Sequence, residues 1–154
     1  MKNMELIQNY NALVHIQKRE KEYYEKNGKQ LLGGRIGILY AMKKNMKEIL
    51  DKLDPYQESL NVLKEEYRDQ EKEEAVYQEA MRQYRENHEK GSAPEMNQIF
   101  RKEKDREVYE EKIKELLDID VQDISIQKVN IEALDGLELS SEDLDAFMFM
   151  LIEE

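Results

Sequence analysis

The chain has 154 residues, enough for one domain with a modest core, and we expect a single domain over residues 1–154. It contains no cysteine, which excludes disulfide bonds, thiolate metal sites and cysteine nucleophiles. No apolar run is long enough to span a bilayer and the first residues lack the pattern of a signal peptide, so we expect a cytoplasmic protein with no membrane partner.

The net charge of -11 is divided unevenly along the chain. Residues 1–53 have a net charge of +5, residues 54–117 a net charge of -6, and residues 118–154 a net charge of -10. An acidic end that follows a basic start can dock on that start, on a second copy of the chain or on a basic partner. The charges alone leave these three alternatives open.

The basic segment, residues 1–53, is predicted to form a base of two helices. The first covers residues 4–26, where apolar side chains recur every three or four positions, and it ends at Gly28. The second covers residues 30–53 and ends before Pro55, because a residue that precedes proline avoids the helical conformation.

Three small residues, Gly33, Gly37 and Ala41, would share one face of the second predicted helix. A glycine inside a helix costs up to about 1 kcal/mol, so we expect a compensating close approach of another helix. The alternative is a phosphate-binding loop at residues 33–37. A predicted helix precedes it instead of a strand, and no Gly-Lys-Ser/Thr follows it, so helix packing is the favoured interpretation.

Residues 54–117 are predicted to form a long antiparallel hairpin of two highly charged helices, with its tip at residues 91–94. The outgoing arm carries apolar and polar positions at alternating spacings of three and four, which is a heptad pattern. At the tip, Gly91 ends one helix, and Ser92 with Glu95 forms a capping box for the next.

The tip of this hairpin is the first predicted partner-binding surface. Counting symmetrically about the turn places Phe100 opposite Tyr84, with Met96 beside them, so that an apolar cluster lies at the far end of the hairpin. Protruding helical hairpins bind other macromolecules more often than they catalyse reactions. We therefore predict that Tyr84, Met96 and Phe100 contact a partner.

Residues 118–154 are predicted to form a short β segment and a final helix. Branched apolar residues alternate between positions 119 and 131, which predicts one or two strands that pair with each other or with an edge of a partner. Ser140 followed by Asp143 predicts the start of the helix, and the apolar run 147–152 indicates either core or interface. This end supplies the second predicted partner-binding surface, namely Asp143, Asp145 and Phe149.

No residue pattern predicts catalysis, a cofactor or a metal ion. His15 and His88 lie outside the Glu-x-x-His and His-Glu-x-x-His patterns of metal sites. The acidic residues 118–123 lack the central glycine and the terminal glutamate of a calcium loop. Lysines at 43–47 suggest nucleic-acid binding, which the net negative charge opposes. We therefore expect a non-enzymatic protein without cofactors.

The segment 131–144 reads IEALDGLELSSEDL and follows a basic helix pair and a charged hairpin. In this order and in this segment the chain resembles small uncharacterised helical proteins encoded by phages and prophages of Gram-positive bacteria. The resemblance implies the cytoplasm of a bacterial host. It supplies no catalytic motif.

The expected fold class is mainly α, a long helical hairpin on a small helical base with a short β segment and a final helix at the carboxy terminus. The expected function is binding of another protein, as an inhibitor of a host enzyme or defence complex. One version uses the acidic end as a mimic of nucleic acid. The alternative is a virion-assembly helper or a self-associating structural protein, including a homodimer.

Overall fold

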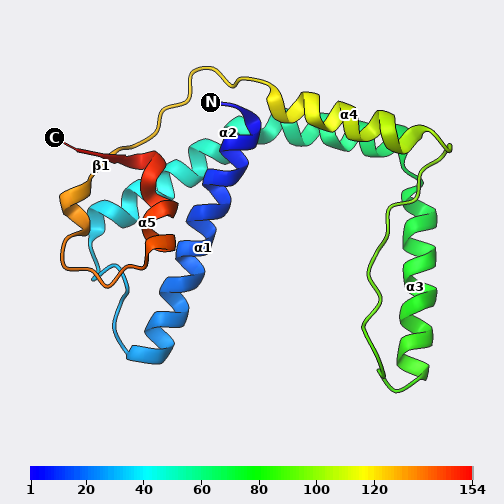
Figure 1. The fold of residues 1–154 in the computed structure, drawn as a ribbon, viewed down its shortest axis with the longest axis horizontal. Coiled ribbons are helices and arrows are strands. Elements are labelled where there is room, and N and C mark those ends of the chain that lie inside the picture. The colour runs from blue at the N-terminus through cyan, green and yellow to red at the C-terminus, as the bar shows by residue number, and fades with distance from the viewer. Residues whose placement is uncertain (154) are drawn as a thin grey trace. The chain divides into compact units, whose positions relative to one another are not determined.

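The computed structural model describes residues 1–153 and is mainly helical, which confirms the predicted fold class. Its contacts divide the chain into two compact units. The first unit consists of Met1–Pro55 together with Asp118–Glu154, and the second unit is Tyr56–Leu117. Helix α2 contributes residues to both units (Figure 1). No helix among residues 1–153 is long and apolar enough to cross a membrane.

Helix α1, Asn3–Asn27, begins and ends close to its predicted bounds. Its inward stripe includes the fully buried Leu6, Leu13 and Ile16, which recur at helical spacing. Gly28 follows with a φ of +68°, the left-handed conformation that glycine adopts without strain, and its N–H donates to the carbonyl of Tyr24.

Helix α2, Ile36–Tyr67, differs from the prediction at both ends. It begins at Ile36 because Gly33 and Gly34 have φ of +59° and +66°, which an α-helix does not permit. The predicted helical face of Gly33, Gly37 and Ala41 is therefore wrong. A Cβ on Gly33 would lie 3.3 Å from Leu137, so this turn is packed closely against the carboxy-terminal segment.

The prediction that Pro55 ends the second helix is also wrong. Pro55 lies inside α2, exposed to solvent, although an internal proline removes one backbone hydrogen bond and typically costs about 3 kcal/mol. The apolar stripe continues through the proline at helical spacing, from the buried Ile49 to the half-buried Tyr56 and Leu63. Burial of these apolar side chains offsets the free-energy cost of the proline inside the helix.

The carboxy-terminal segment forms a small parallel sheet and a short helix in the first unit. Strand β1, Val129–Asn130, pairs with strand β2, Leu151–Ile152, and the 3-10 helix η1, Ile131–Leu134, follows β1. Helix α5, Ser141–Phe147, leads through the 3-10 helix η2, Met148–Met150, into β2. Of the predicted β segment at 119–131, only Val129–Asn130 forms a strand, and it pairs within its own chain. The apolar run 147–152 is not one continuous helix.

Side chains from distant segments form the core of the first unit. Phe147 and Met150 are fully buried and belong to the same cluster as Leu13 and Ile38. The buried amide of Asn45 on α2 both donates to the backbone carbonyl of Gln127 at 2.9 Å and accepts from its N–H at 2.7 Å. Phe147 and Met150 of the apolar run are therefore core, whereas Met148 and Ile152 of the same run are exposed.

The basic start and the acidic end of the chain meet in the first unit. Arg19 lies 3.4 Å from Asp143, and Lys29 lies 3.7 Å from Glu138. The guanidinium of Arg35 donates to the backbone carbonyls of Ala133 and Asp135. Part of the acidic charge is thus neutralised within the chain.

The second unit contains the end of α2, helix α3, Gln70–Glu86, and helix α4, Asp105–Asp118. The predicted return helix from residue 92 is wrong, because residues 93–99 have no regular structure and α4 begins only at Asp105. Arg101 N–H donates to the carbonyl of Tyr67 at 3.0 Å, and Asp69 N–H donates to the carbonyl of Ile99 at 2.8 Å.

These two hydrogen bonds explain why the return arm is not helical. The chain leaves α3 at Glu86 and is back beside its first turn at Ile99. Helix α3 has 17 residues, so this distance is about 25 Å at 1.5 Å per residue. A 13-residue helix would rise only about 20 Å, whereas extended backbone covers more than 3 Å per residue.

Candidate functional site

The first predicted partner-binding surface is divided by the structure into two places. Phe100 forms an isolated β-bridge with Arg68, next to the start of α3. Tyr84 lies 14 residues into the same helix from Gln70, about 20 Å along its axis at 1.5 Å per residue. The predicted contact between Phe100 and Tyr84 is therefore wrong, and only Tyr84 and Met96 remain near the tip.

Phe100 belongs instead to an aromatic cluster at the start of α3. Its ring meets Tyr109 of α4 edge-on, with centroids 5.5 Å apart and planes at 64°. The guanidinium of Arg106 lies 4.9 Å from the centroid of Phe100, within the range of a cation–π contact. Tyr109 is almost fully buried, so this cluster is the packing centre of the second unit.

A buried ion pair joins this cluster to α3. Arg68 donates to both carboxylate oxygens of Glu73, at 2.8 and 2.7 Å, and Glu73 also accepts from the N–H of Ile99 at 2.8 Å. The hydrogen bonds from Arg68 hold the pKa of Glu73 below its ordinary value, although burial opposes them. The pair ties three segments together and fixes the loop 87–99 at Ile99.

Beyond this ion pair, the tip of the second unit is open to solvent. We define the tip as residues 74–98. Tyr77, Met81 and Tyr84 form a half-buried stripe on α3 at spacings of four and three. Residues 91–98 make no hydrogen bond in the structure, and all of them are exposed except the half-buried Pro94. Met96 in this segment is 49% exposed.

The second predicted surface is also divided. Asp143 is fully buried, so it belongs to the packing of α5 and not to an exposed surface. Its carboxylate accepts from the N–H of Ser140 at 3.0 Å, the Ser140 hydroxyl accepts from the Asp143 N–H at 3.1 Å, and Arg19 approaches at 3.4 Å. Burial raises the pKa of Asp143, but these hydrogen bonds outweigh it and the net shift is downward.

The other two residues of this surface remain accessible to different degrees. Asp145 is exposed, and Phe149 is half-buried against the core. Leu144 and Met148 lie four residues apart and are 38% and 62% exposed. Leu144 of α5 and Met148 of η2 therefore form an exposed apolar edge, and the carboxylate of Asp145 lies next to Leu144 in the sequence.

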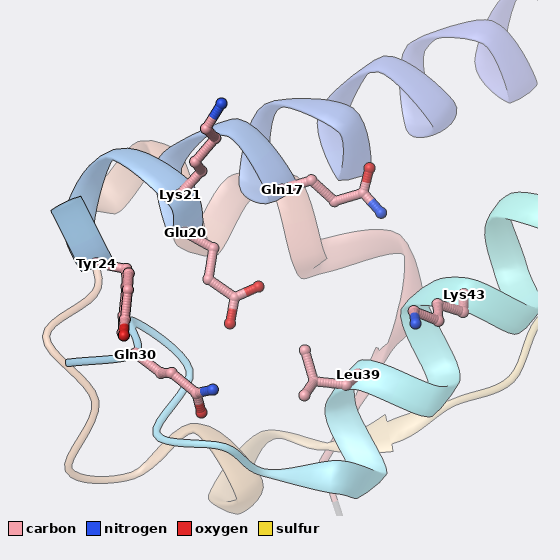
Figure 2. Close-up of a pocket in the computed structure, with 7 residues that line it drawn as sticks. All are labelled: Gln17, Glu20, Lys21, Tyr24, Gln30, Leu39 and Lys43. Carbon is pink, nitrogen blue, oxygen red and sulfur yellow. The ribbon is translucent and has the colours of Figure 1, made fainter. Parts of the chain in front are cut away.

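A pocket in the first unit was not predicted from the sequence. It has a volume of about 500 Å³ and is bounded by α1, by the loop that follows it and by α2. Figure 2 shows the carboxylate of Glu20 pointing into this space, with Gln30, Leu39 and Lys43 around it, whereas the amine of Lys21 points away.

One signal in the sequence was available for this pocket. Gln17, Glu20 and Tyr24 recur at helical spacing and so place a polar stripe beside the apolar face of α1. The facing residues Gln30 and Lys43 carry no such signal, because the turn at residues 33–34 decides where α2 begins. Sequence periodicity identifies one wall of the pocket and cannot supply the other.

Among residues 1–153, no group of three or more histidine, aspartate or glutamate side chains is arranged to hold a metal ion. His15 lies 3.9 Å from the buried carboxylate of Asp143 and is itself 45% exposed. The candidate binding surfaces are thus the open tip at residues 74–98, the apolar edge of Leu144 and Met148, and the pocket around Glu20. No protein-family model, curated protein or solved structure matches the chain.

Proposed function

We propose that this chain is a non-enzymatic protein that acts by binding another protein through the tip of its second unit. The observation that carries the proposal is the segment 91–98, which is exposed and leaves its backbone N–H and C=O groups without partners inside the chain. Water satisfies these groups in the free protein. A partner that offers a strand edge replaces that water with main-chain hydrogen bonds.

The exposed segment is anchored at one end, which favours such binding. Glu73 and Asp69 anchor the returning chain at Ile99, so the segment is fixed at the end nearest the packing centre. An anchored segment loses less conformational entropy on binding than a free one. The entropic cost of ordering the segment therefore cancels less of the binding free energy than it would for an unanchored segment.

The side chains of the tip give such an interface its specificity. Met96 and the stripe of Tyr77, Met81 and Tyr84 supply apolar and aromatic contact area. Tyrosine and methionine are enriched in protein interfaces because they bury large surfaces and adapt to a partner's shape. The partner we propose presents an exposed strand edge flanked by apolar side chains.

In its more specific form, the proposal is that the partner is an enzyme or a defence complex of a bacterial host, which the chain inhibits. This form is supported by the resemblance of the segment 131–144 to phage-encoded proteins. The remaining exposed carboxylates of the acidic end, including Asp145, are available for a basic surface of the same partner.

Site-specific photocrosslinking tests the proposal. Benzoylphenylalanine is placed at position 96 in the tip, or at position 4 on α1 as a control, because Met96 and Met4 are 49% and 45% exposed. Each full-length protein is irradiated in nuclease-treated lysate of a Gram-positive bacterium, with and without phage infection. We expect an adduct with one protein at position 96 and none at position 4.

A backbone variant connects the adduct to the proposed mode of binding. Gln98→Pro removes one N–H from the exposed segment, and we expect it to reduce the adduct at position 96 strongly. Equal adducts at positions 96 and 4, or adducts at neither, would contradict binding through the tip. An adduct between two copies of the chain would indicate self-association instead of a host partner. An adduct with virion proteins would support the assembly alternative.

A further inference from the structure

The pocket of the first unit contains a carboxylate without a partner. Glu20 is half-buried between α1 and α2 and makes no hydrogen bond or ion pair in the structure. Burial raises the pKa of its carboxyl group, with no cation close enough to lower it. Figure 2 shows this carboxylate directed into the space between α1 and α2.

Three other polar side chains of the pocket, which are exposed to solvent, have no partner within the chain. Lys43 on α2 makes no ion pair, and the side-chain amides of Gln17 and Gln30 make no hydrogen bond. In Figure 2 these three side chains lie around the space that Glu20 faces, and Leu39 adds an apolar wall. Glu20 and Lys43 have opposite charges and line the same pocket, yet they do not pair with each other.

We propose that this pocket binds a small zwitterion of the class of free α-amino acids. Glu20 accepts the ammonium group, Lys43 pairs with the carboxylate, and Leu39 contacts a short apolar side chain. Gln17 and Gln30 supply amide donors and acceptors for the remaining polar atoms. A volume of about 500 Å³ lies within the range of small-molecule pockets, which combine an apolar wall with a few convergent polar groups.

The zwitterion follows from charge balance inside the pocket. A ligand with only an ammonium group leaves Lys43 without a counter-charge, and a ligand with only a carboxylate adds a second anion beside Glu20. Two carboxylates held close together repel each other. A ligand that carries both charges satisfies both side chains at once. This inference is independent of the proposed binding at the tip.

Titration of the full-length, isotope-labelled protein with three related probes tests the inference by NMR. L-leucine carries both charges, L-leucinamide only the ammonium group, and N-acetyl-L-leucine only the carboxylate. We expect saturable shifts of the amides of Glu20, Gln30 and Lys43 with L-leucine. The two other probes should bind at least about tenfold more weakly, since each lacks one charge-assisted contact.

Two pairs of variants make the test specific. Glu20→Gln and Lys43→Gln should each weaken binding of L-leucine by about tenfold. Glu22→Gln and Lys47→Gln lie outside the pocket on the same two helices and should bind L-leucine as the wild type does. Absence of saturable shifts with L-leucine would overturn the inference. So would equal binding of L-leucinamide, which would identify a peptide amino terminus as the ligand.

Discussion

At the scale of single residues, the buried polar groups determine how the segments are held together. Glu73, Asn45 and Asp143 are each 5% exposed or less, and each bonds to backbone or to a cation that is distant in sequence. Burial of a polar group costs free energy unless its bonds are made. These side chains therefore select one arrangement of the chain over its alternatives.

Replacement of Glu73 tests this at the packing centre of the second unit. Glu73→Gln keeps the shape of the side chain but leaves the guanidinium of Arg68 without its charge partner. We expect the free energy of unfolding to fall by about 3 kcal/mol, as for other buried ion pairs that lose one member. Urea denaturation followed by circular dichroism measures the change.

The matched control is Glu79→Gln, because Glu79 pairs with Arg82 on the exposed surface of α3. Exposed ion pairs contribute little to stability, since water and salt screen them. The control should unfold at the same urea concentration as the wild type. A similar loss in both variants would show that the burial of Glu73 contributes nothing.

Stability should depend on pH through Asp143. Its pKa in the folded protein lies below the ordinary value of 3.8, so the unfolded chain takes up the proton first as the pH falls. The stabilising contribution of Asp143 is therefore complete well above pH 3.8 and is lost as the pH falls through the folded-state pKa. Asp143→Asn lacks this titration.

We expect the difference in unfolding free energy between the wild type and Asp143→Asn to be largest at neutral pH. It should shrink as the pH falls below the ordinary pKa of 3.8, and it should vanish only below the folded-state pKa, where both proteins carry an uncharged side chain at this position. Urea denaturation at a series of pH values gives the difference directly. A difference that stays constant over this range would refute the role of the ionised carboxylate.

At the scale of elements, two similar sequence signals had opposite outcomes. Ser140 with Asp143 and Ser92 with Glu95 are both capping-box patterns. The first caps α5 as predicted, and the second lies in residues 91–98 and starts no helix. The difference is tertiary, because Ile99 must reach the first turn of α3 and a helix from residue 92 is too short to bring it there.

This contrast predicts the effects of two serine substitutions. Ser140→Ala removes a hydroxyl that accepts from the N–H of Asp143, and should cost about 1 kcal/mol of unfolding free energy. Ser92→Ala removes no hydrogen bond and should leave the stability unchanged. Thermal or urea denaturation of both variants measures these changes in unfolding free energy. A loss of stability in Ser92→Ala would indicate that the predicted return helix forms after all.

At the scale of the whole molecule, the two compact units share α2 but have separate packing centres. Phe147 lies in the core of the first unit, and Tyr109 packs with Phe100 in the second. The division of the contacts implies that damage to one core is felt mainly within its own unit. Single-domain behaviour of residues 1–154 stays a prediction.

Phe147→Ala tests how far the units depend on each other. The side chain is fully buried, so its removal should cost about 3–5 kcal/mol. Hydrogen exchange read by mass spectrometry should then accelerate in α1 and α5, with little change in α3. Equal acceleration in all three helices would show that the chain unfolds as one cooperative unit.

Local patterns in the sequence determined the mainly helical class, the start and end of α1 and the cap of α5. These features depend on contacts between residues three or four apart, which periodicity and capping residues reveal. The sequence also indicated that the basic start and the acidic end can dock, without choosing between this and a partner.

Tertiary structure alone decided the rest. The pairing of β1 with β2 and the path of residues 91–99 depend on groups far apart in the chain. The open tip and the pocket around Glu20 arise in the same way, since each has walls from two or more segments. Long-range packing overrides local preference wherever the apolar area buried and the hydrogen bonds made exceed the local cost.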